Sequence, residues 1–537
     1  MTASFHRGAR LGLVILASAT LSWKTPAAGD AERPQPGEDL FRAGSIPRLR
    51  IELAPAAMAS LRENPRQFVA ATVSDGSAVY SQVAVHLKGA TGSFRPLDDK
   101  PGLTLDFSRF QAGRKFRGLR RIHLNNSVED PSYLNEKLGG EFFQSAGMPA
   151  PRVTRALVAL NDGPPRLYVL KEGFTEDFLA RHFEHVGGEL YEPGVGHDVD
   201  EKLSRNSVSA PFDPGQSALK RLSAAAQEPD PARRWQALEA TLDTKRFLGF
   251  MAAEVMLGHR DGYSLNRNNF RVYHDLDSGK IVFFPHGMDQ LLGTAELPWQ
   301  PNWAGLVARA VMNTPGGSQR YAATFGSLLT NQFNVERLTG RVDELVAELR
   351  PAITKDEFAK VCAAAALVKE RIANRKSSLL AQLNRPALRP LEFAADGGRP
   401  EGWETADRPA GGTIDQADLD GRPTLHISTR SESLAAWKTT VLLPRGRYRF
   451  ADRVRVAGVE PLPFAAHPGA RLRVGGNPRE TASLTGDSSW RELAADFEVE
   501  QPMAKVELIC ELRARAGDAW FDLPALRVLR IDNAHEN

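Results

Sequence analysis

Cysteine is scarce in this chain of 537 residues, which contains only Cys362 and Cys510. Two thiols are too few for a four-thiolate zinc site, and the 12 histidines form no H-E-x-x-H pattern, so a zinc hydrolase gains no support. The two cysteines fall in different predicted domains. A disulfide in an oxidising compartment and two separate buried thiols both stay open.

An excess of one charge is also lacking, because 68 Lys and Arg residues face 65 Asp and Glu residues and the net charge is +3. The chain has no run of basic residues with aromatic residues interleaved. The composition therefore favours neither nucleic acid nor an anionic membrane surface as a partner. A hydrophobic content of 42% and a charged content of 25% are typical of globular domains.

The apolar stretch at residues 11–21 is too short to span a bilayer, which takes about 20 residues. It follows a basic region with His6, Arg7 and Arg10, and small residues come after it. This order is typical of a secretory signal. We expect residues 1–28 to be a signal peptide, no transmembrane segment to follow, and the mature protein to be secreted, periplasmic or at the surface of a bacterial cell.

The rest of the chain divides by composition and periodicity. Residues 46–130 are rich in alternating, strand-like patterns, residues 236–385 are mainly helical, and residues 194–235 are expected to be an insertion or a loop. The predicted segments are a loose stretch rich in Pro and Gly (29–45), an α+β domain (46–385), a linker (386–400) and an all-β domain (401–537).

The stretch "HRDGYSLNRNNF" at 259–270 places Asp261 before a cluster of amides, and "FFPHGMD" brings a second acid, Asp289, after an apolar run. Phosphoryl transfer needs such a set, with one carboxylate that orients a hydroxyl and further oxygens that hold Mg²⁺. The spacing from Asp261 to Asn266 matches the pattern H-R-D-x-x-x-x-N. Taken alone, the match is equally explained by Asp and Asn side chains that cap turns.

The surroundings of this motif favour the functional interpretation. Residues 243–258 are predicted to form an amphipathic helix before it, and residues 270–274 and 280–284 a β-hairpin after it. A helix over 132–146, with Asp130 at its start, carries Glu136 and Glu141. Either glutamate is a candidate partner for a lysine of the predicted sheet.

Upstream, the strand at 83–88 runs into the loop "KGATGS", and Lys100 follows. A loop with glycines lets backbone N–H groups approach phosphates, and a lysine adds positive charge. An ordinary hairpin with a polar tip is the alternative explanation.

Five segments in this order resemble the spore coat protein H kinase-like family, the CotH kinases. The matching segments are "HLKGATGS" with Lys100, "LRRIHLNNSVEDPSYLNEKLGGEFFQSAGMPAPR", "LYVLKEGFTEDFLARHF", "HRDGYSLNRNNFRVY" and "FFPHGMDQLLG". The resemblance implies an atypical two-lobed protein-kinase-like fold that binds ATP with Mg²⁺ or Mn²⁺. It also implies a protein substrate with Ser or Thr acceptors on a secreted or surface protein.

Residue by residue, the resemblance implies a role for each matching position. Asp261 resembles the catalytic aspartate, and Asp289 the metal-binding acid, with the metal also held by Asn266 or Asn268 of the amide cluster that includes Asn269. The residues expected to bind the nucleotide are Lys88, Gly89, Ser93, Lys100, Glu141 and Glu172.

Two neighbouring positions depart from the family pattern "P-W-D-x-D". Gly287 stands in place of the first acid, and His286 in place of the tryptophan. If that acid holds metal in the family, this chain lacks one ligand, and a histidine replaces it poorly because Mg²⁺ prefers oxygen. A pseudokinase, a different metal and a different donor all stay open.

The all-β domain shows short strands separated by regular turns, which predicts a sandwich of jelly-roll type. Its ending resembles carbohydrate-binding modules, so glycans are candidate partners. Trp403, Trp437 or Tyr448 could stack on sugars if exposed, whereas Trp490 and Trp520 are expected in the core.

Two functions therefore compete. The first is a secreted ATP-dependent Ser/Thr kinase that uses Asp261, Asp289 and Lys100. The second is a non-catalytic, pseudokinase-like surface or matrix protein that binds glycans or proteins through its C-terminal sandwich. The first function is favoured by the intact Asp261, Asn266, Lys100 and Asp289. The second is favoured by Gly287 and by the predicted export, because ATP is scarce outside the cytoplasm.

Overall fold

The computed structural model describes residues 35–531 apart from 43, 45, 91, 207–212, 385–387, 408, 410, 463–466 and 477–481. The predicted signal peptide, residues 1–28, lies outside these ranges. Contacts divide the chain into two compact units, Met1–Asn384 and Arg385–Asn537. Within the described ranges, no helix is both long and apolar enough to cross a membrane.

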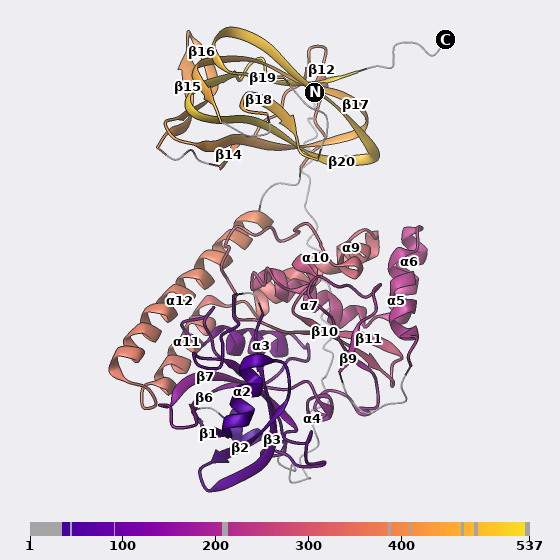
Figure 1. The fold of residues 1–537 in the computed structure, drawn as a ribbon. Helices are drawn as coiled ribbons and strands as arrows, with labels where there is room; N and C mark the ends of the chain where they lie inside the picture. Colours follow the sequence, from indigo (N-terminus) through magenta and orange to yellow (C-terminus); the bar gives the residue numbers. More distant parts are fainter. Residues whose placement is uncertain are drawn as a thin grey trace, which may run out of the picture. The chain divides into compact units, whose positions relative to one another are not determined.

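The first unit begins with a closed β-barrel (Figure 1). Its strands lie in the order β1 (Arg48–Leu53), β2 (Val69–Asp75), β3 (Ala78–Lys88), β4 (Gly102–Asp106), β5 (Arg121–Asn125), β7 (Arg166–Glu172) and β6 (Val153–Leu160). Strand β1 alternates exposed and buried residues along its length, because successive side chains point to opposite faces. Pairing of β1 with β6 closes the barrel, so these strands leave no open edge.

Helices and a second sheet make up the rest of this unit. The sheet has the strand order β11 (Lys280–Pro285), β10 (Phe270–Asp275), β8 (Leu190–Glu192) and β9 (Ser204–Asn206). The helices are α1 (Glu38–Phe41), α2 (Pro55–Glu63), α3 (Asn135–Ser145), α4 (Glu176–Leu179), α5 (Ser217–Gln227), α6 (Pro231–Thr241), α7 (Thr244–Met256), α8 (Tyr263–Asn266), α9 (Leu306–Met312), α10 (Pro315–Asn331), α11 (Val335–Leu349) and α12 (Lys355–Leu383).

The helix–loop–hairpin unit predicted around the motif is present as α7, the loop with Asp261, and the hairpin β10–β11. Helix α3 lies where a helix was expected. The expectation of an insertion or loop at 194–235 needs correction, since this stretch contains β9, α5 and the start of α6. Helix α1 falls in the stretch expected to be loose, and its Leu40 is buried.

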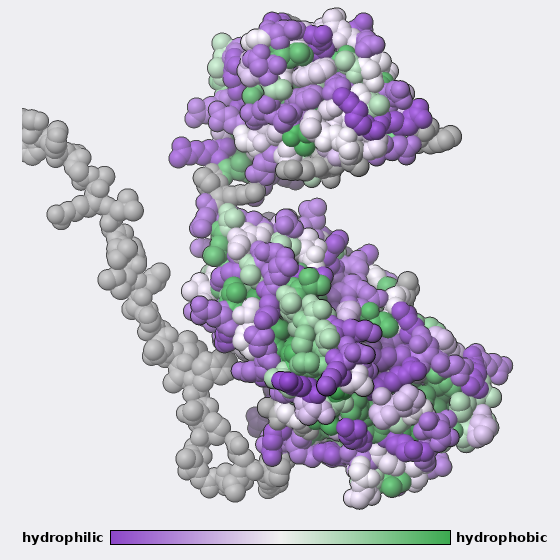
Figure 2. All heavy atoms as spheres, turned by 90° about the vertical axis from the view of Figure 1, so that its left-hand side faces the viewer, coloured by the Kyte–Doolittle hydropathy of each residue, from purple (hydrophilic) through white to green (hydrophobic). Residues whose placement is uncertain are grey.

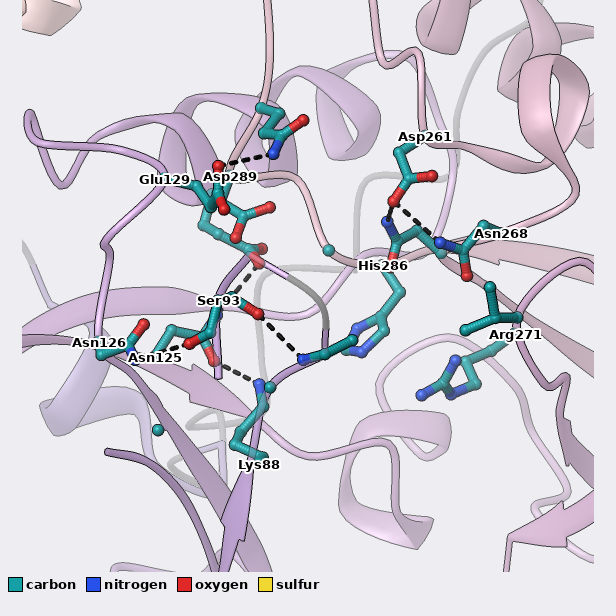
Figure 3. A pocket seen from close by; sticks show the side chains of 18 of the residues that line it. Lys88, Ser93, Asn125, Asn126, Glu129, Asp261, Asn268, Arg271, His286 and Asp289 are labelled. Atoms are coloured by element: carbon teal, nitrogen blue, oxygen red, sulfur yellow. Dashed lines mark hydrogen bonds between the residues drawn. The ribbon is translucent and has the colours of Figure 1, made fainter. Parts of the chain in front are cut away.

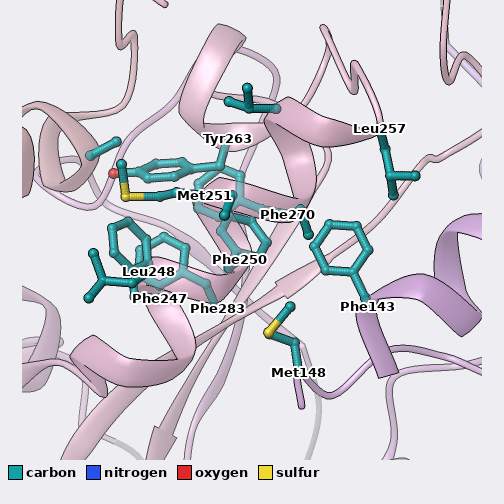
Figure 4. Close-up of a cluster of buried hydrophobic side chains, with 14 of the residues drawn as sticks. Phe143, Met148, Phe247, Leu248, Phe250, Met251, Leu257, Tyr263, Phe270 and Phe283 are labelled. Carbon is teal, nitrogen blue, oxygen red and sulfur yellow. The ribbon is translucent and has the colours of Figure 1, made fainter. Parts of the chain in front are cut away.

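An aromatic cluster joins α7 to the hairpin beneath the motif loop (Figure 4). The Tyr263 ring lies 4.5 Å from that of Phe270 and 4.8 Å from that of Phe283, and Phe247 also contacts Phe283 at 4.8 Å. Close aromatic packing of this kind fixes backbone segments because cores are packed as densely as organic crystals. The loop between α7 and β10 is therefore fastened at both ends.

The second unit is all β, as predicted. Its strands are β12 (Phe393–Ala394), β13 (Gly397–Gly398), β14 (Glu404–Asp407), β15 (Thr413–Leu419), β16 (Arg422–Thr429), β17 (Ser433–Pro461), β18 (Gly469–Val474), β19 (Ser483–Leu484), β20 (Gly486–Asp522) and β21 (Arg527–Arg530). The long strands β17 and β20 pair with one another and supply most of its apolar core.

The aromatic residues of this unit are placed differently from expectation. Trp437 and Tyr448 are buried in the core, and Trp403 packs against it. Trp490 and Trp520, which were expected inside, are half-buried and stand outside the core cluster. Strand alternation alone did not show which face of each strand points inward.

The surface side chains visible in Figure 2 are mainly hydrophilic. Cys362 in α12 and the buried Cys510 in β20 are both free thiols, so the disulfide considered above is not formed. Among the described residues, exposed large apolar side chains such as Leu367 on α12 are few, because most apolar residues are buried inside the two units.

Candidate functional site

A cavity of about 270 Å³ in the first unit brings together residues from the barrel, the motif loop and the end of the hairpin (Figure 3). Its lining consists of Lys88, Gly89, Ala90, Ser93, Gly102, Asn125, Asn126, Glu129, Glu136, Glu192, Pro193, Val195, Asp261, Asn268, Asn269, Arg271, His286, Gly287, Asp289 and Gln290. Most of these side chains are polar or charged. The cavity is therefore suited to a polar, charged ligand.

Asp261 is held by three amides. Its Oδ1 accepts a hydrogen bond from Asn266 Nδ2 at 2.6 Å, and its Oδ2 accepts from Nδ2 of Asn268 at 2.9 Å and of Asn269 at 2.7 Å. Because each amide donates its NH₂ group, the carboxylate is kept in one orientation. Asn266 and Asn268, which were expected to hold the metal, thus position Asp261 together with Asn269.

The loop that carries Asp261 is anchored from below by Glu254, which is fully buried on α7. One carboxylate oxygen accepts from the Tyr263 N–H at 2.8 Å and the other from the Ser264 N–H at 2.9 Å. These N–H groups lie at the start of the short helix α8 and have no partner within it, so the Glu254 side chain caps the helix. Burial raises the pKa of Glu254 to about 7.

Asp289 lies in the segment after β11 and lines the same cavity. Burial and the nearby Glu136 carboxylate raise its pKa to about 6. Its backbone oxygen accepts from Asn135 Nδ2 at 2.7 Å, which ties the Asp289 segment to the first turn of α3. The predicted role of Asp130 fits this geometry, since its Oδ2 accepts from the Leu134 and Asn135 N–H groups at 2.8 Å each.

A chain of ionic and polar contacts crosses the back of the cavity. Lys171 on β7 is fully buried, and its Nζ donates to Glu136 Oε2 on α3 at 2.9 Å and to His286 Nδ1 at 3.1 Å. Glu136 also accepts from Asn125 Nδ2 at 3.2 Å, and Asn125 in turn accepts from Lys88 Nζ. The chain links β3, β5, α3, β7 and the segment after β11.

Burial sets the protonation states along this chain. Although burial raises the pKa of Glu136, the ammonium of Lys171 more than offsets it and the pKa is lowered. Burial and the nearby Lys171 lower the pKa of Lys88 to about 8. Burial and the same Lys171 hold the pKa of His286 well below its usual value. Its ring is therefore neutral and accepts a hydrogen bond from the Lys171 ammonium group.

The loop after β3 has the tight turn that its glycines predict. Gly89 has φ +109° and Gly92 has φ +92°, values that favour glycine. The Ser93 hydroxyl accepts from the Ala90 N–H at 3.1 Å, which closes the turn. Lys88, Gly89 and Ser93 all line the cavity as expected, while Thr91 lies outside the described residues.

Three expected nucleotide-binding residues lie elsewhere. Lys100 donates to the Tyr133 hydroxyl at 2.7 Å and packs over the Tyr133 and Tyr168 rings. Glu141 faces α11, where Arg341 binds it at 2.9 and 3.0 Å. Glu172 is buried between two arginines. These three residues were expected at the nucleotide because of their order in the family's segments. In the structure their side chains bind other partners and do not line the cavity.

Sequence reasoning also missed Arg271, which lines the cavity, and Lys171, which contacts the lining residues Glu136 and His286. Arg271 on β10 is buried, and its guanidinium contacts Glu192 and the Phe270 carbonyl. Lys171 lies next to Glu172 on β7, and only Glu172 was singled out from the sequence. The alternation of β7 could have pointed to Lys171, because neighbouring residues of a strand face opposite sides.

The oxygen donors of the cavity suit a hard divalent cation. Asp261 and Asp289 offer carboxylate oxygens, and Asn268 and Asn269 offer amide oxygens, which is the ligand chemistry of Mg²⁺ and Mn²⁺. In the described part of the chain, no group of three or more His, Cys, Asp and Glu side chains is arranged to hold a metal ion. Any cation here would depend on amide, water or ligand oxygens as well.

Comparisons of the sequence with known proteins match the first unit to one family. The sequence model of the family described as CotH kinase protein matches residues 85–373, more than half of the chain. The inner spore coat protein H of Bacillus subtilis (strain 168) is 22% identical over 272 residues, which are 47% of this chain and 74% of that protein.

Two solved structures show weaker likenesses. The Helicobacter pylori proinflammatory kinase CtkA is 8% identical with a TM-score of 0.25 and covers 56% of this chain and 98% of its own. The CBM22-1 xylan-binding domain of Paenibacillus barcinonensis Xyn10C is 14% identical with a TM-score of 0.18 and covers 28% of this chain and 100% of its own.

Of the two glutamates on α3, the contacts of Lys171 indicate that Glu136 contributes more to the stability of the first unit than Glu141 does. Glu136→Gln leaves the buried Lys171 ammonium without a carboxylate, so we expect the first unit to lose about 3–5 kcal/mol of unfolding free energy in urea. Glu141→Gln on the same helix is the matched control. Its side chain is 33% exposed, so about 1 kcal/mol or less is expected. Equal losses in the two variants would contradict the assignment of Glu136 to the buried pair.

Proposed function

The chain belongs to the CotH kinase family, and from this premise we propose that it is an atypical kinase that transfers the γ-phosphate of ATP to Ser or Thr hydroxyls of extracytoplasmic or surface proteins. The observation that carries the proposal is the Asp261 carboxylate, fixed by three amides on the cavity that Asp289 and Lys88 also line. This arrangement matches what phosphoryl transfer requires, namely positioning and charge stabilisation.

Each residue has a role that follows from its position. Asp261 accepts a hydrogen bond from the acceptor hydroxyl and receives its proton as the oxygen attacks. Lys88 places a positive charge beside the glycine turn, whose backbone N–H groups suit phosphate oxygens. Asp289 and the amide oxygens of the cavity would hold the divalent cation. Bound Mg²⁺–ATP would supply the phosphoryl group and offset its charge.

The acceptor class follows from the proposed export of the chain. The basic residues before the apolar stretch at 11–21, with small residues after it, support secretion or display at the cell surface. Acceptors would then be proteins of the same compartment. Mass spectrometry of the protein purified from its native source, showing a mature N-terminus near residue 28 or an intact Met1, tests this part directly.

Loss of either acid should abolish transfer. We expect Asp261→Asn and Asp289→Asn each to lower labelled phosphate incorporation from ATP by at least about 100-fold, measured on the chain itself and on casein with Mg²⁺ and Mn²⁺. Asp356→Asn, at an exposed position in the first turn of α12, is the control and should keep full activity. A wild-type chain that binds no ATP with either cation would end the kinase proposal.

The pKa values of the site predict a pH window for nucleotide binding. Cation binding needs ionised Asp289, with its pKa raised to about 6, and phosphate binding needs charged Lys88, with its pKa lowered to about 8. Affinity for Mn²⁺–ADP, measured calorimetrically, should therefore fall about tenfold per pH unit below 6 and above 8. Lys88→Arg keeps its charge and should lose the alkaline fall, whereas an unchanged alkaline fall would exclude Lys88.

A second binding function is supported by one surface of the all-β unit. The half-buried Trp520 stacks on His426, with ring centres 5.0 Å apart. His426 contacts Asp415 Oδ1 at 2.9 Å and Asp518 Oδ1 at 3.1 Å. An aromatic ring beside fixed carboxylates is the chemistry that holds a sugar, which offers apolar C–H faces and hydroxyls. We propose glycan binding on this surface.

Glycan binding is tested by replacing the two half-buried tryptophans in turn. In affinity electrophoresis against xylan, galactan and peptidoglycan fragments, Trp520→Ala should lose retardation by at least about tenfold. Trp490→Ala, a matched change in the same strand β20, should bind as wild type does. Retardation that survives in Trp520→Ala, or that no polysaccharide causes, would remove this surface as the glycan site.

A further inference from the structure

The Asn269 side chain leaves no room for a side chain at Gly287. The φ of Gly287 is +54°, in the left-handed region, and a Cβ atom built there would lie 2.5 Å from Asn269 Cγ and still closer to Asn269 Oδ1. Real Cβ atoms do not approach other atoms so closely. The space that a side chain at 287 would enter is therefore occupied by the amide group of Asn269.

The orientation of this amide is fixed by its neighbours. Asn269 Nδ2 donates to Asp261 Oδ2 at 2.7 Å, and a carboxylate accepts only from the NH₂ side of an amide. The carbonyl oxygen Oδ1 consequently points away from Asp261 and toward Gly287. The Asn269 backbone is held as well, since its carbonyl oxygen accepts from the His286 N–H at 2.9 Å.

Two other candidates for an extra ligand, His286 and Asn266, are less well placed than Asn269. The Nδ1 atom of His286 accepts a hydrogen bond from the Lys171 ammonium group. Asn266 is exposed and does not line the cavity. Asn268 also lines the cavity. Only Asn269 occupies the space that a side chain at position 287 would take.

We propose that Asn269 Oδ1 is the oxygen donor that replaces an acid at position 287, and that it binds the divalent cation together with Asp289. The inference rests on the proposed function, because the cation is the one that accompanies the nucleotide. A neutral amide in place of a carboxylate reduces the negative charge of the site. The lower charge favours a cation that arrives already bound to nucleotide phosphates over a free ion.

The test measures cation binding rather than activity. Mn²⁺ bound to the full chain with ADP is quantified by electron paramagnetic resonance in four proteins, which are the wild type, Asn269→Gly, Asn266→Gly and the double variant Asn269→Gly with Gly287→Asp. The double variant opens the space and returns an acid, and Asp is among the residues that tolerate a left-handed φ. Circular dichroism confirms that each protein is folded.

We expect Asn269→Gly to weaken Mn²⁺ binding at least tenfold, Asn266→Gly to change it less than threefold, and the double variant to regain the wild-type affinity or exceed it. Asn266→Gly is the matched control, because it also removes one amide hydrogen bond to Asp261. Equal losses from both single variants, or Asn269→Gly binding like wild type, would overturn the proposal. Wild-type Mn²⁺–ADP binding without phosphate transfer would refute the kinase function and leave this inference standing, whereas no Mn²⁺ binding at all would overturn it.

Discussion

The buried ion pair between Lys171 and Glu136 is the contact on which the arrangement of the cavity depends. Burying two charges costs more than their attraction alone returns unless other hydrogen bonds complete the site. Here Asn125 and His286 supply those bonds, and through them the pair reaches Lys88 and the segment that carries Asp289. The pair therefore sets the position of α3 relative to the barrel and the hairpin at the same time.

The opposite side of the cavity is held by different forces. Asp261 sits on a loop whose ends are fastened by the aromatic cluster of α7 and the hairpin and whose backbone N–H groups are capped by Glu254. Three amides then fix the carboxylate itself. Such a site needs little reorganisation when a ligand binds, because its polar groups are already oriented.

The glycine at position 287, where the family pattern has an acid, is interpreted differently once the neighbouring side chains are known. In the sequence it is a missing acid, which suggests lost catalysis. In the fold it is a glycine that makes room for the Asn269 amide beside Asp261. A substitution at one position of a site is thus interpretable only together with the side chain that fills the vacated space. In the second unit, too, the fold decides which residues reach the surface. Trp437 is buried, whereas Trp520 is half-buried and stacks on His426.

The sequence by itself determined the local elements and pointed to two acids, Asp261 and Asp289, that line one cavity in the fold. The helix α7, the hairpin β10–β11 and the glycine turn after β3 follow from periodicity and turn chemistry, which act over a few residues. Asp261, Asp289, Lys88 and Ser93 were found because they lie in such segments. Only the tertiary structure decided that Lys171 and Glu136, and not Lys100 and Glu141, form the buried pair. The physical reason is that a charge is placed by the direction of its side chain and by partners far away in the chain, and neither is encoded in local spacing.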